Sequence, residues 1–547
     1  MMPSPVIVPL QAPRGDALMK PAIEDPEIIA GYLTDASRLV GHAEGLFRPE
    51  NEVQVAAILR AASERNIPVT VVARQTSTTA SSVPFGGWIL SMEKLDRLIE
   101  IDRGGLRARA EGGILLGAFQ KEISDAHLLY PPDPTSRHEC TLGGSVACNA
   151  SGARTFKYGA TRKWIEGLSV VLANGSVLRL GRGEYISEAS STHFHLQTPE
   201  GEQRSLQPPA YQEPGVKHAA GFASTSPFDL IDLFIGSEGT LGVITEVQVR
   251  LLPAPHAVFS IFATFPSESQ ALAFVVEARK SAATGGPITP RCLEFFDRHA
   301  VDILRKHHPE LGFPEEAEVA LFSEQEVGEA DGDPLLEAWF DALTEGGALV
   351  EAEGGVLMAE TDAQMAAFLR ARHTVPAVVN ERAAAHGMPK VGTDLAVPDS
   401  AFADLMALYH QASDAPASLL DADARGALLD TLDTAPTTGD LNTRWAQADF
   451  PERLDTVTFG HIGDNHVHVN FLPQSRQGLA LAKAVYHQLS LKAIEMGGTP
   501  SAEHGIGKIK REALAALFGP QGIDTMRAIK KALDPQGILG RGNLFER

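Results

Sequence analysis

Residues 138–159 read HECTLGGSVACNASGARTFKYG, and this stretch decides how the first half of the chain is interpreted. Small residues surround Gly143, Gly144 and Gly152, so we expect backbone N–H groups that stay open to a close ligand such as a phosphate. The proline-rich run 130–134 is rigid and would hold one wall of the site in place. A lone Gly-Gly pair would indicate only a tight turn, but the length of this run favours a ligand-binding loop.

Two further segments accompany it. Residues 236–244 read GSEGTLGVI and again combine glycines with small side chains. Residues 74–82 read RQTSTTASS, in which six of nine residues are Ser or Thr, whose hydroxyls can donate to phosphate oxygens. An ordinary polar turn is the alternative for this loop, because a backbone position with positive φ is strained without glycine. No GxGxxG turn opens a helix here, so a nicotinamide cofactor finds no support.

Histidines gather in a second site near the end of the chain. Residues 459–470 read FGHIGDNHVHVN, which predicts a strand, a Gly-Asp-Asn turn and a second strand. Side chains alternate along a strand, so His466, His468 and Asn470 share one face. His461 can reach that face from across the turn.

Glu503 and His504 follow in the turn SAEHGIGK, residues 501–508. Two imidazoles and a carboxylate make a good site for a divalent ion with open positions for substrate. Single histidines are more often structural, but four of the chain's 18 histidines lie in these two short segments. Their concentration favours a site.

Two basic residues, Arg372 and Lys390, are candidates for binding an anionic substrate. Residues 371–373 read ARH, and residues 389–398 read PKVGTDLAVP. A guanidinium is the natural bidentate clamp for a carboxylate, which makes Arg372 the first candidate. A helix-borne arginine on its own is usually solvated surface, and Arg370 is the competing choice.

Together these motifs resemble the FAD-linked oxidase family, whose FAD-binding domain is of the vanillyl-alcohol oxidase or PCMH type. The matching residues are Asp133, Pro134, Thr141, Gly143, Gly144, Ala147, Asn149, Ala150, Gly152, Tyr158 and Gly159, followed by residues 236–244. The histidine pattern resembles the His-x6-His…Glu-His site of the branch with D-lactate dehydrogenase, glycolate oxidase and D-2-hydroxyglutarate dehydrogenase. The resemblance covers about residues 40–547, although loop 74–82 lacks the glycines of the family's Arg-Gly-Gly-Gly-Thr loop.

The resemblance implies an α+β fold in two domains. A PCMH-type FAD-binding domain would span residues 1–255, with its core at about 40–255. A ferredoxin-like α+β substrate or cap domain would span residues 256–455. Residues 456–547 would form a C-terminal segment that carries the metal and catalytic motifs and completes the site.

Local patterns predict the elements around these motifs. Apolar residues at helical spacing predict a helix over residues 49–65, and a β-branched run predicts a strand over 67–73. An Asn-Gly pair predicts a hairpin within 165–180. We expect a long polar loop over 186–228 and an exposed insertion over 421–450.

The resemblance also assigns residue roles. FAD would contact Arg74, Thr76, Ser77, Thr78, Pro132, Asp133, Ser136, Thr141, Gly143, Gly144, Ala147, Asn149, Gly152, Ala153, Glu238, Gly242, Val243 and Ile244. A divalent metal of the Zn or Mn type would bind His461, His468 and Glu503, while His466 stands where the branch commonly has asparagine. His504 would be the catalytic base, and the substrate would contact Arg372, Lys390 and Asn470.

The implied reaction is the FAD-dependent oxidation of a small D-2-hydroxy acid, such as D-lactate, glycolate or D-2-hydroxyglutarate, to the 2-oxo acid. A dehydrogenase is favoured over an oxidase, with a quinone, an electron-transfer protein or a cytochrome as electron acceptor. One alternative is a metal-dependent hydrolase, in which the His/His/Glu site activates water. Another is a flavin-binding protein without catalytic activity, given the altered loop 74–82.

Composition limits the class of protein further. The chain of 547 residues is long enough for two or three domains, and a net charge of −22 disfavours nucleic acid as a partner. Three cysteines without a CxxC motif fit a reducing compartment. We find no signal-peptide pattern, and the apolar stretch 258–263 is far shorter than the roughly 20 residues that span a bilayer. We therefore expect a soluble cytoplasmic protein, with peripheral membrane attachment as the alternative and a homodimer as a possible assembly.

Overall fold

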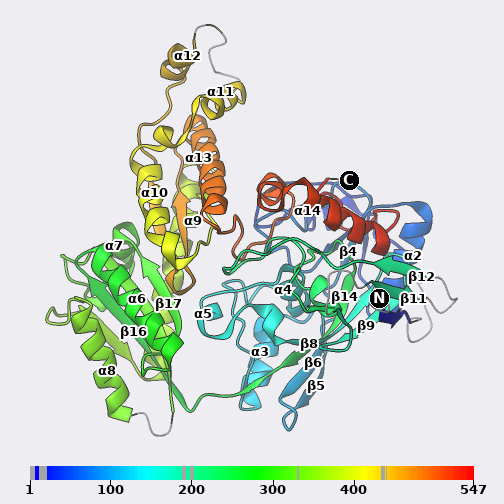
Figure 1. Ribbon diagram of the computed structural model, residues 1–547, viewed down its shortest axis with the longest axis horizontal. Coiled ribbons are helices and arrows are strands. Elements are labelled where there is room, and N and C mark those ends of the chain that lie inside the picture. Colours follow the sequence, from blue (N-terminus) through cyan, green and yellow to red (C-terminus); the bar gives the residue numbers. More distant parts are fainter. Residues whose placement is uncertain are drawn as a thin grey trace, which may run out of the picture.

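The computed structural model describes residues 6–11, 21–187, 193–197, 203–328, 332–432, 438 and 440–546. Two lobes lie side by side in Figure 1, an N-terminal lobe in blue and cyan and a cap lobe in green and yellow. The C-terminal helix α14 (Arg511–Leu533, red) lies over the N-terminal lobe. The α+β fold class is therefore confirmed. Within the described residues, no helix is long and apolar enough to cross a membrane.

A small parallel sheet and one helix open the N-terminal lobe. The helix α2 (Glu52–Arg65) confirms the helix expected over 49–65 and begins after Asn51, whose side chain accepts a hydrogen bond from the N–H of Gln54 at 3.0 Å. Its apolar face packs on a sheet of order β2-β4-β3. The strands are β2 (Gly45–Phe47), β4 (Trp88–Ser91) and β3 (Val69–Val72).

A five-stranded antiparallel sheet forms the centre of this lobe, in the order β5-β6-β14-β8-β9. The expected hairpin is confirmed, because β8 and β9 pair from Val171↔Val177 and Gly175 turns between them with φ +80°. The short helices α3 (Leu116–Asp125) and α4 (Leu142–Cys148) belong to this lobe. The strands are β5 (Leu98–Asp102), β6 (Arg107–Glu111), β14 (Val243–Arg250), β8 (Ile165–Val171) and β9 (Val177–Gly181).

The expectation of a loop over 186–228 is wrong in part. Four short strands occur there, in two pairs: β10 (Ile186–Ser187) with β13 (Phe228–Asp229), and β11 (Phe194–Gln197) with β12 (Gln203–Leu206). The polar composition of this stretch gave no strand pattern, because only a few apolar side chains such as Phe194 and Leu206 are buried. Residues 188–192 and 198–202 of this stretch lie outside the described residues.

The cap lobe is built on a seven-stranded sheet of order β19-β16-β18-β17-β21-β22-β20. Its strands are β19 (Val356–Ala359), β16 (Ala257–Phe265), β18 (Val319–Val327), β17 (Pro290–Phe296), β21 (Thr456–His461), β22 (His466–Phe471) and β20 (Val391–Gly392). The hairpin β21–β22, which follows residue 455, therefore continues the sheet that begins at Ala257. The histidine motif stands on the strands of the cap sheet itself.

Helices cover this sheet and extend beyond it. They are α6 (Glu268–Thr284), α7 (Arg298–His307), α8 (Gly332–Glu345), α9 (Asp362–Ala385), α10 (Phe402–Asp414) and α13 (Arg476–Glu495). The insertion expected over 421–450 carries α11 (Ala422–Asp430) and α12 (Leu441–Gln447), which stand at the far end of the cap lobe in Figure 1. Residues 433–437 and 439 of the insertion lie outside the described residues.

The end of the chain returns to the N-terminal lobe. Leu514, Met526 and Ile529 of α14 are buried in the core of that lobe. The N–H of Val69 in β3 donates to the carbonyl of Ile538 at 2.8 Å, which extends the small sheet by one bridge. The turn 501–508 that precedes α14 therefore crosses from the cap lobe to the N-terminal lobe.

Candidate active site

A cavity of about 670 Å³ lies where the two lobes meet. The N-terminal lobe lines it with parts of loop 73–82, segment 134–151 and segment 238–244. The cap lobe contributes side chains of α9, among them His373 and Asn380. Glu503 and His504 complete the lining, so the glycine-rich segments and the histidine site face one space.

Most of the residues expected to contact FAD line this cavity. They are Arg74, Thr76, Ser77, Thr78, Ser136, Thr141, Gly143, Gly144, Ala147, Glu238, Gly242, Val243 and Ile244. Five others stand behind the wall: Pro132, Asp133, Asn149, Gly152 and Ala153. Asn149, for example, ends α4 in a left-handed conformation and accepts a hydrogen bond from the N–H of Arg162 at 3.0 Å.

The glycines of segment 138–159 serve close packing, which corrects the expectation that their N–H groups are open. The N–H of Gly143 donates to the carbonyl of Gly112 at 2.8 Å, and that of Gly144 donates to Thr141 Oγ1 at 3.0 Å. A Cβ on Gly143 would lie 2.7 Å from Gly112 O, and one on Gly152 would lie 2.2 Å from Asp133 O. Glycine is required at both places because backbone passes against backbone.

Loop 74–82 offers the open donors instead. The backbone N–H groups of residues 74–78 donate to no acceptor in the described part of the chain, and these residues line the cavity. Gln75 and Ala80 adopt positive φ values of 57° and 61° although neither is glycine. A run of free N–H groups beside an arginine and several hydroxyls suits a phosphate-bearing cofactor, so the cavity fits FAD.

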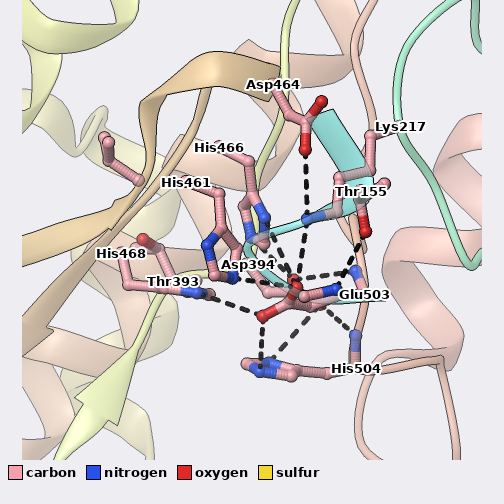
Figure 2. A network of polar contacts seen from close by, with 12 residues as sticks. Thr155, Lys217, Thr393, Asp394, His461, Asp464, His466, His468, Glu503 and His504 are labelled. Carbon is pink, nitrogen blue, oxygen red and sulfur yellow. Dashed lines mark hydrogen bonds and ion pairs between the residues drawn. The ribbon is translucent and has the colours of Figure 1, made fainter. Parts of the chain in front are cut away.

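Four potential metal ligands converge next to this cavity (Figure 2). Donor atoms of His461, His466, His468 and Glu503 all lie within 4.8 Å of one another. The Nε2 atoms of His461 and His468 each lie 3.3 Å from an oxygen of Glu503. The hairpin β21–β22 supplies the three imidazoles, and the turn after α13 supplies the carboxylate.

Hydrogen bonds from outside the cluster orient two of these imidazoles. His461 Nδ1 lies 2.5 Å from Glu294 Oε1, and His468 Nδ1 donates to the carbonyl of Thr393 at 2.6 Å. Both Nε2 atoms therefore face Glu503. Metal-binding histidines are typically oriented in this way, by a hydrogen bond from the ring nitrogen that does not bind the metal. Burial opposes the charged form of His461, but the carboxylates of Glu294 and Glu503 outweigh it and raise its pKa to about 9.

His466 provides the clearest test of whether these residues fit a cation. The residue is fully buried, and burial holds its pKa well below the usual value. Its Nε2 lies 3.1 Å from Asp394 Oδ1 and its Nδ1 lies 3.8 Å from Glu503 Oε2, yet neither ring nitrogen meets hydrogen-bond geometry within the described chain. Buried polar atoms without a partner are costly, so these residues fit a divalent cation.

Lys217 was not foreseen from the sequence, although it lies inside this cluster. Its Nζ lies 3.1 Å from Glu503 Oε2 and 3.6 Å from Asp464 Oδ2, and its side chain is only 5% exposed. Burial disfavours the ammonium, but the carboxylates of Glu503 and Asp464 raise the pKa of Lys217 above its ordinary value. No local pattern in the stretch 186–228 distinguishes this lysine from a solvated one.

Asp394 is a second unforeseen residue, and it shapes the turn that carries Glu503 and His504. Its two oxygens accept hydrogen bonds from the N–H groups of both residues at 3.1 Å. Its Oδ2 also pairs with the ammonium of Lys510 at 2.5 Å. Burial opposes its ionisation, but His504 and Lys510 hold the pKa of Asp394 well below its usual range.

His504 lies between the cluster and the cavity. Its ring stacks on that of His468 with centroids 5.3 Å apart, and its side chain remains 34% exposed. Partial burial of the ring lowers the pKa of His504 to about 4, although Asp394 and Glu503 act in the opposite direction. The imidazole is therefore neutral at physiological pH and able to accept a proton.

The three candidate substrate contacts, Arg372, Lys390 and Asn470, do not line the cavity. The guanidinium of Arg372 is held by Glu294 Oε2 at 2.7 and 3.0 Å, whereas Arg370 is exposed. Lys390 donates to Asn470 Oδ1 at 3.3 Å, and burial lowers the pKa of Lys390 to about 8. None of the three candidates is among the cavity-lining residues, whose nearest member on α9 is His373.

A cavity between an α+β N-terminal lobe and an α+β cap lobe, with a histidine–carboxylate cluster beside it, fits a flavin-dependent class of protein. The chain belongs to the FAD-linked oxidase family. The family model "FAD linked oxidases, C-terminal domain" matches residues 254–544, and the family model "FAD binding domain" matches residues 43–181. Both expectations, the family and its FAD-binding domain, are confirmed.

Curated relatives match nearly the whole chain at low identity. "Glycolate oxidase subunit GlcD" of Bacillus subtilis is 27% identical over 92% of this chain and 89% of that protein. "D-lactate dehydrogenase" of Anaerostipes hadrus is 26% identical, covering 95% and 93%, and "D-2-hydroxyglutarate dehydrogenase" of Xanthomonas citri is 27% identical, covering 91% and 88%. Among solved structures, an alkyldihydroxyacetonephosphate synthase shares the fold with a TM-score of 0.60 at 15% identity, over 95% of this chain and 81% of the other.

Proposed function

We propose that this protein oxidises a small D-2-hydroxy acid to the 2-oxo acid, with FAD as electron acceptor and a divalent metal as aid. The observation that carries the proposal is the position of His504, a neutral imidazole that lines the cofactor cavity and stacks on a member of the metal cluster. Relatives named for glycolate, D-lactate and D-2-hydroxyglutarate support the substrate class.

Residues of the N-terminal lobe would hold the FAD. The open N–H groups and hydroxyls of loop 74–78 would bind the pyrophosphate, and Gly144 and segment 238–244 would form the opposite wall. FAD supplies a two-electron acceptor, and the metal supplies positive charge that favours loss of the hydroxyl proton.

The side chains of the cap lobe would bind and orient the substrate. His461, His468 and Glu503 would hold the metal, with His466 as a fourth candidate. Arg372 would attract the substrate carboxylate, with Lys390 and Asn470 as further polar contacts. His504 would accept the hydroxyl proton at its cavity-facing ring, which its low pKa allows at neutral pH.

Three experiments test the proposal. A visible spectrum with flavin bands would exclude a hydrolase that works with metal alone, and a panel of 2-hydroxy acids with an artificial electron acceptor would identify the substrate. In an anaerobic stopped-flow, His504→Ala should keep its FAD but reduce it about 10²- to 10⁴-fold more slowly than wild type. The exposed His487→Ala serves as the matched control. Reduction of the His504→Ala flavin at the wild-type rate would remove His504 from the reaction.

The natural electron acceptor and the compartment are part of the same proposal. A quinone, an electron-transfer protein or a cytochrome would reoxidise the flavin, which makes the protein a dehydrogenase rather than an oxidase. The three cysteines are free thiols in the structure, which supports a reducing compartment such as the cytoplasm.

A further inference from the structure

Lys217 is held in a fixed place beside the cluster of His461, His466, His468 and Glu503, unlike a lysine on the solvated surface. Its neighbour Ala219 donates its N–H to the carbonyl of Ser501, at 2.9 Å, which ties this part of the N-terminal lobe to the turn that bears Glu503. The side chain of Lys217 is 5% exposed, so its ammonium has no access to bulk water as an alternative partner. The ammonium is therefore part of the site.

Three positive or metal-binding groups converge on one carboxylate oxygen. Glu503 Oε2 lies 3.1 Å from Lys217 Nζ, 3.3 Å from His461 Nε2 and 3.8 Å from His466 Nδ1. Glu503 Oε1 faces His468 Nε2 at 3.3 Å, so a divalent cation between these imidazoles and Glu503 would lie next to the oxygen that the ammonium contacts. The ammonium and a metal ion that both contact Glu503 would be like charges a few ångströms apart, and away from bulk water such charges repel each other strongly. The ammonium and the metal therefore compete.

Asp464 provides a second position for the ammonium. It stands in the turn of the hairpin, between the two histidines, and its Oδ2 atom is buried without a hydrogen-bond partner in the described chain. That oxygen lies 3.6 Å from Lys217 Nζ, on the side away from Glu503 in Figure 2. A movement of under about 1 Å would bring the ammonium to ordinary hydrogen-bond distance from it.

We propose that Lys217 is a tethered cation that exchanges with the divalent metal. Its ammonium pairs with Glu503 when the metal is absent and moves to Asp464 Oδ2 when the metal takes Glu503. The exchange keeps the buried carboxylate compensated in both states, since an unpaired buried charge is strongly destabilising. This inference rests on the metal site of the proposed function.

The test measures the affinity for metal directly. The full-length, FAD-loaded protein is stripped by chelation and titrated with Zn²⁺ and, separately, Mn²⁺ against a chromogenic chelator. Lys217→Met removes the competing cation and should tighten binding by about tenfold or more. Asp464→Asn removes the second position and should weaken binding by a similar factor, and the double variant should bind as tightly as Lys217→Met. Lys157→Met, whose ammonium pairs with Glu326 instead, should bind metal like the wild type.

Each outcome decides the matter. If the wild type binds metal but Lys217→Met binds it no more tightly, or Asp464→Asn binds it no less tightly, the exchange is refuted while the metal site stands. If neither the wild type nor Lys217→Met binds either ion, the metal site of the proposed function fails, and the exchange fails with it. Should Lys217→Met not fold, the Asp464→Asn titration decides alone.

Discussion

Replacing Glu294 with glutamine should loosen the metal site and the cap sheet at the same time. Glu294 stands on β17, and its two oxygens divide their work: Oε1 meets His461 Nδ1 at 2.5 Å, and Oε2 meets the Arg372 guanidinium at 2.7 Å. All three side chains are at most 12% exposed. The amide keeps the shape but removes the charge on which both partners depend.

The structure supports two magnitudes for this change. Loss of one member of a buried ion pair costs about 3–5 kcal/mol, because the other charge is left uncompensated; here that charge is Arg372. Glutamine keeps an oxygen that can accept from His461 Nδ1, but it lacks the charge, and mutation of the partner behind a ligating histidine typically costs about 10- to 100-fold in metal affinity. The second factor corresponds to about 1.4–2.7 kcal/mol of binding free energy.

A neighbouring glutamate separates the two effects. Glu324 on β18 is equally buried and pairs with Arg154 at 2.9 Å, but it does not touch the histidine cluster. Glu294→Gln and Glu324→Gln should both lower the free energy of unfolding in a urea titration followed by circular dichroism. Only Glu294→Gln should weaken Zn²⁺ or Mn²⁺ binding in a chelator competition. Equal metal affinities in the two variants would refute the role of Glu294 in orienting His461.

Three further predictions concern the cavity and its loop. Gly144→Val should purify with little flavin, because even a Cβ there would lie 2.9 Å from Thr141 Oγ1 at the cavity wall; Gly215→Val, with open space around it, should keep full absorbance at the flavin bands. Ala80→Gly should raise the free energy of unfolding by about 0.5–1 kcal/mol, since relief of positive φ exceeds the entropy cost of glycine; a decrease would show that the loop is not strained. The rate of flavin reduction should rise with pH through about 4, where His504 loses its proton, and be level above about pH 6; an inflection near pH 6.5 would contradict this pKa.

Local patterns were sufficient for much of the fold. The helix α2 and the hairpin β8–β9 follow from apolar spacing and an Asn-Gly turn, which act within a few residues. The strands β11 and β12 were missed because each is four residues long and at least half polar, so their pairing depends on packing against distant parts of the chain. The two-residue strand β20 is likewise defined only by its partner β22.

The candidate site likewise contains residues that local patterns predict and residues that only the fold brings together. The spacing of His461 and His468 on a hairpin was readable from the sequence because strand geometry places them on one side. The partners that orient them, Glu294 and Thr393, come from elements about 170 and 75 residues away in the chain, and no spacing rule connects them. The glycine run was recognised as important for the wrong reason: its N–H groups are satisfied internally, and the open donors lie in the loop without glycines.

The turn that carries Glu503 and His504 is held by both lobes. From the cap side, buried Asp394 accepts the N–H groups of both residues at 3.1 Å. From the N-terminal side, buried Glu238 accepts the N–H groups of residues 506 and 507 at 2.7 Å. One carboxylate from each lobe therefore fixes the same few residues, and a shift of one lobe against the other would move His504, the proposed base, relative to the cavity. Because Glu238 also lines that cavity, one side chain belongs both to the wall expected to contact the flavin and to the support of the turn that bears His504, the proposed base.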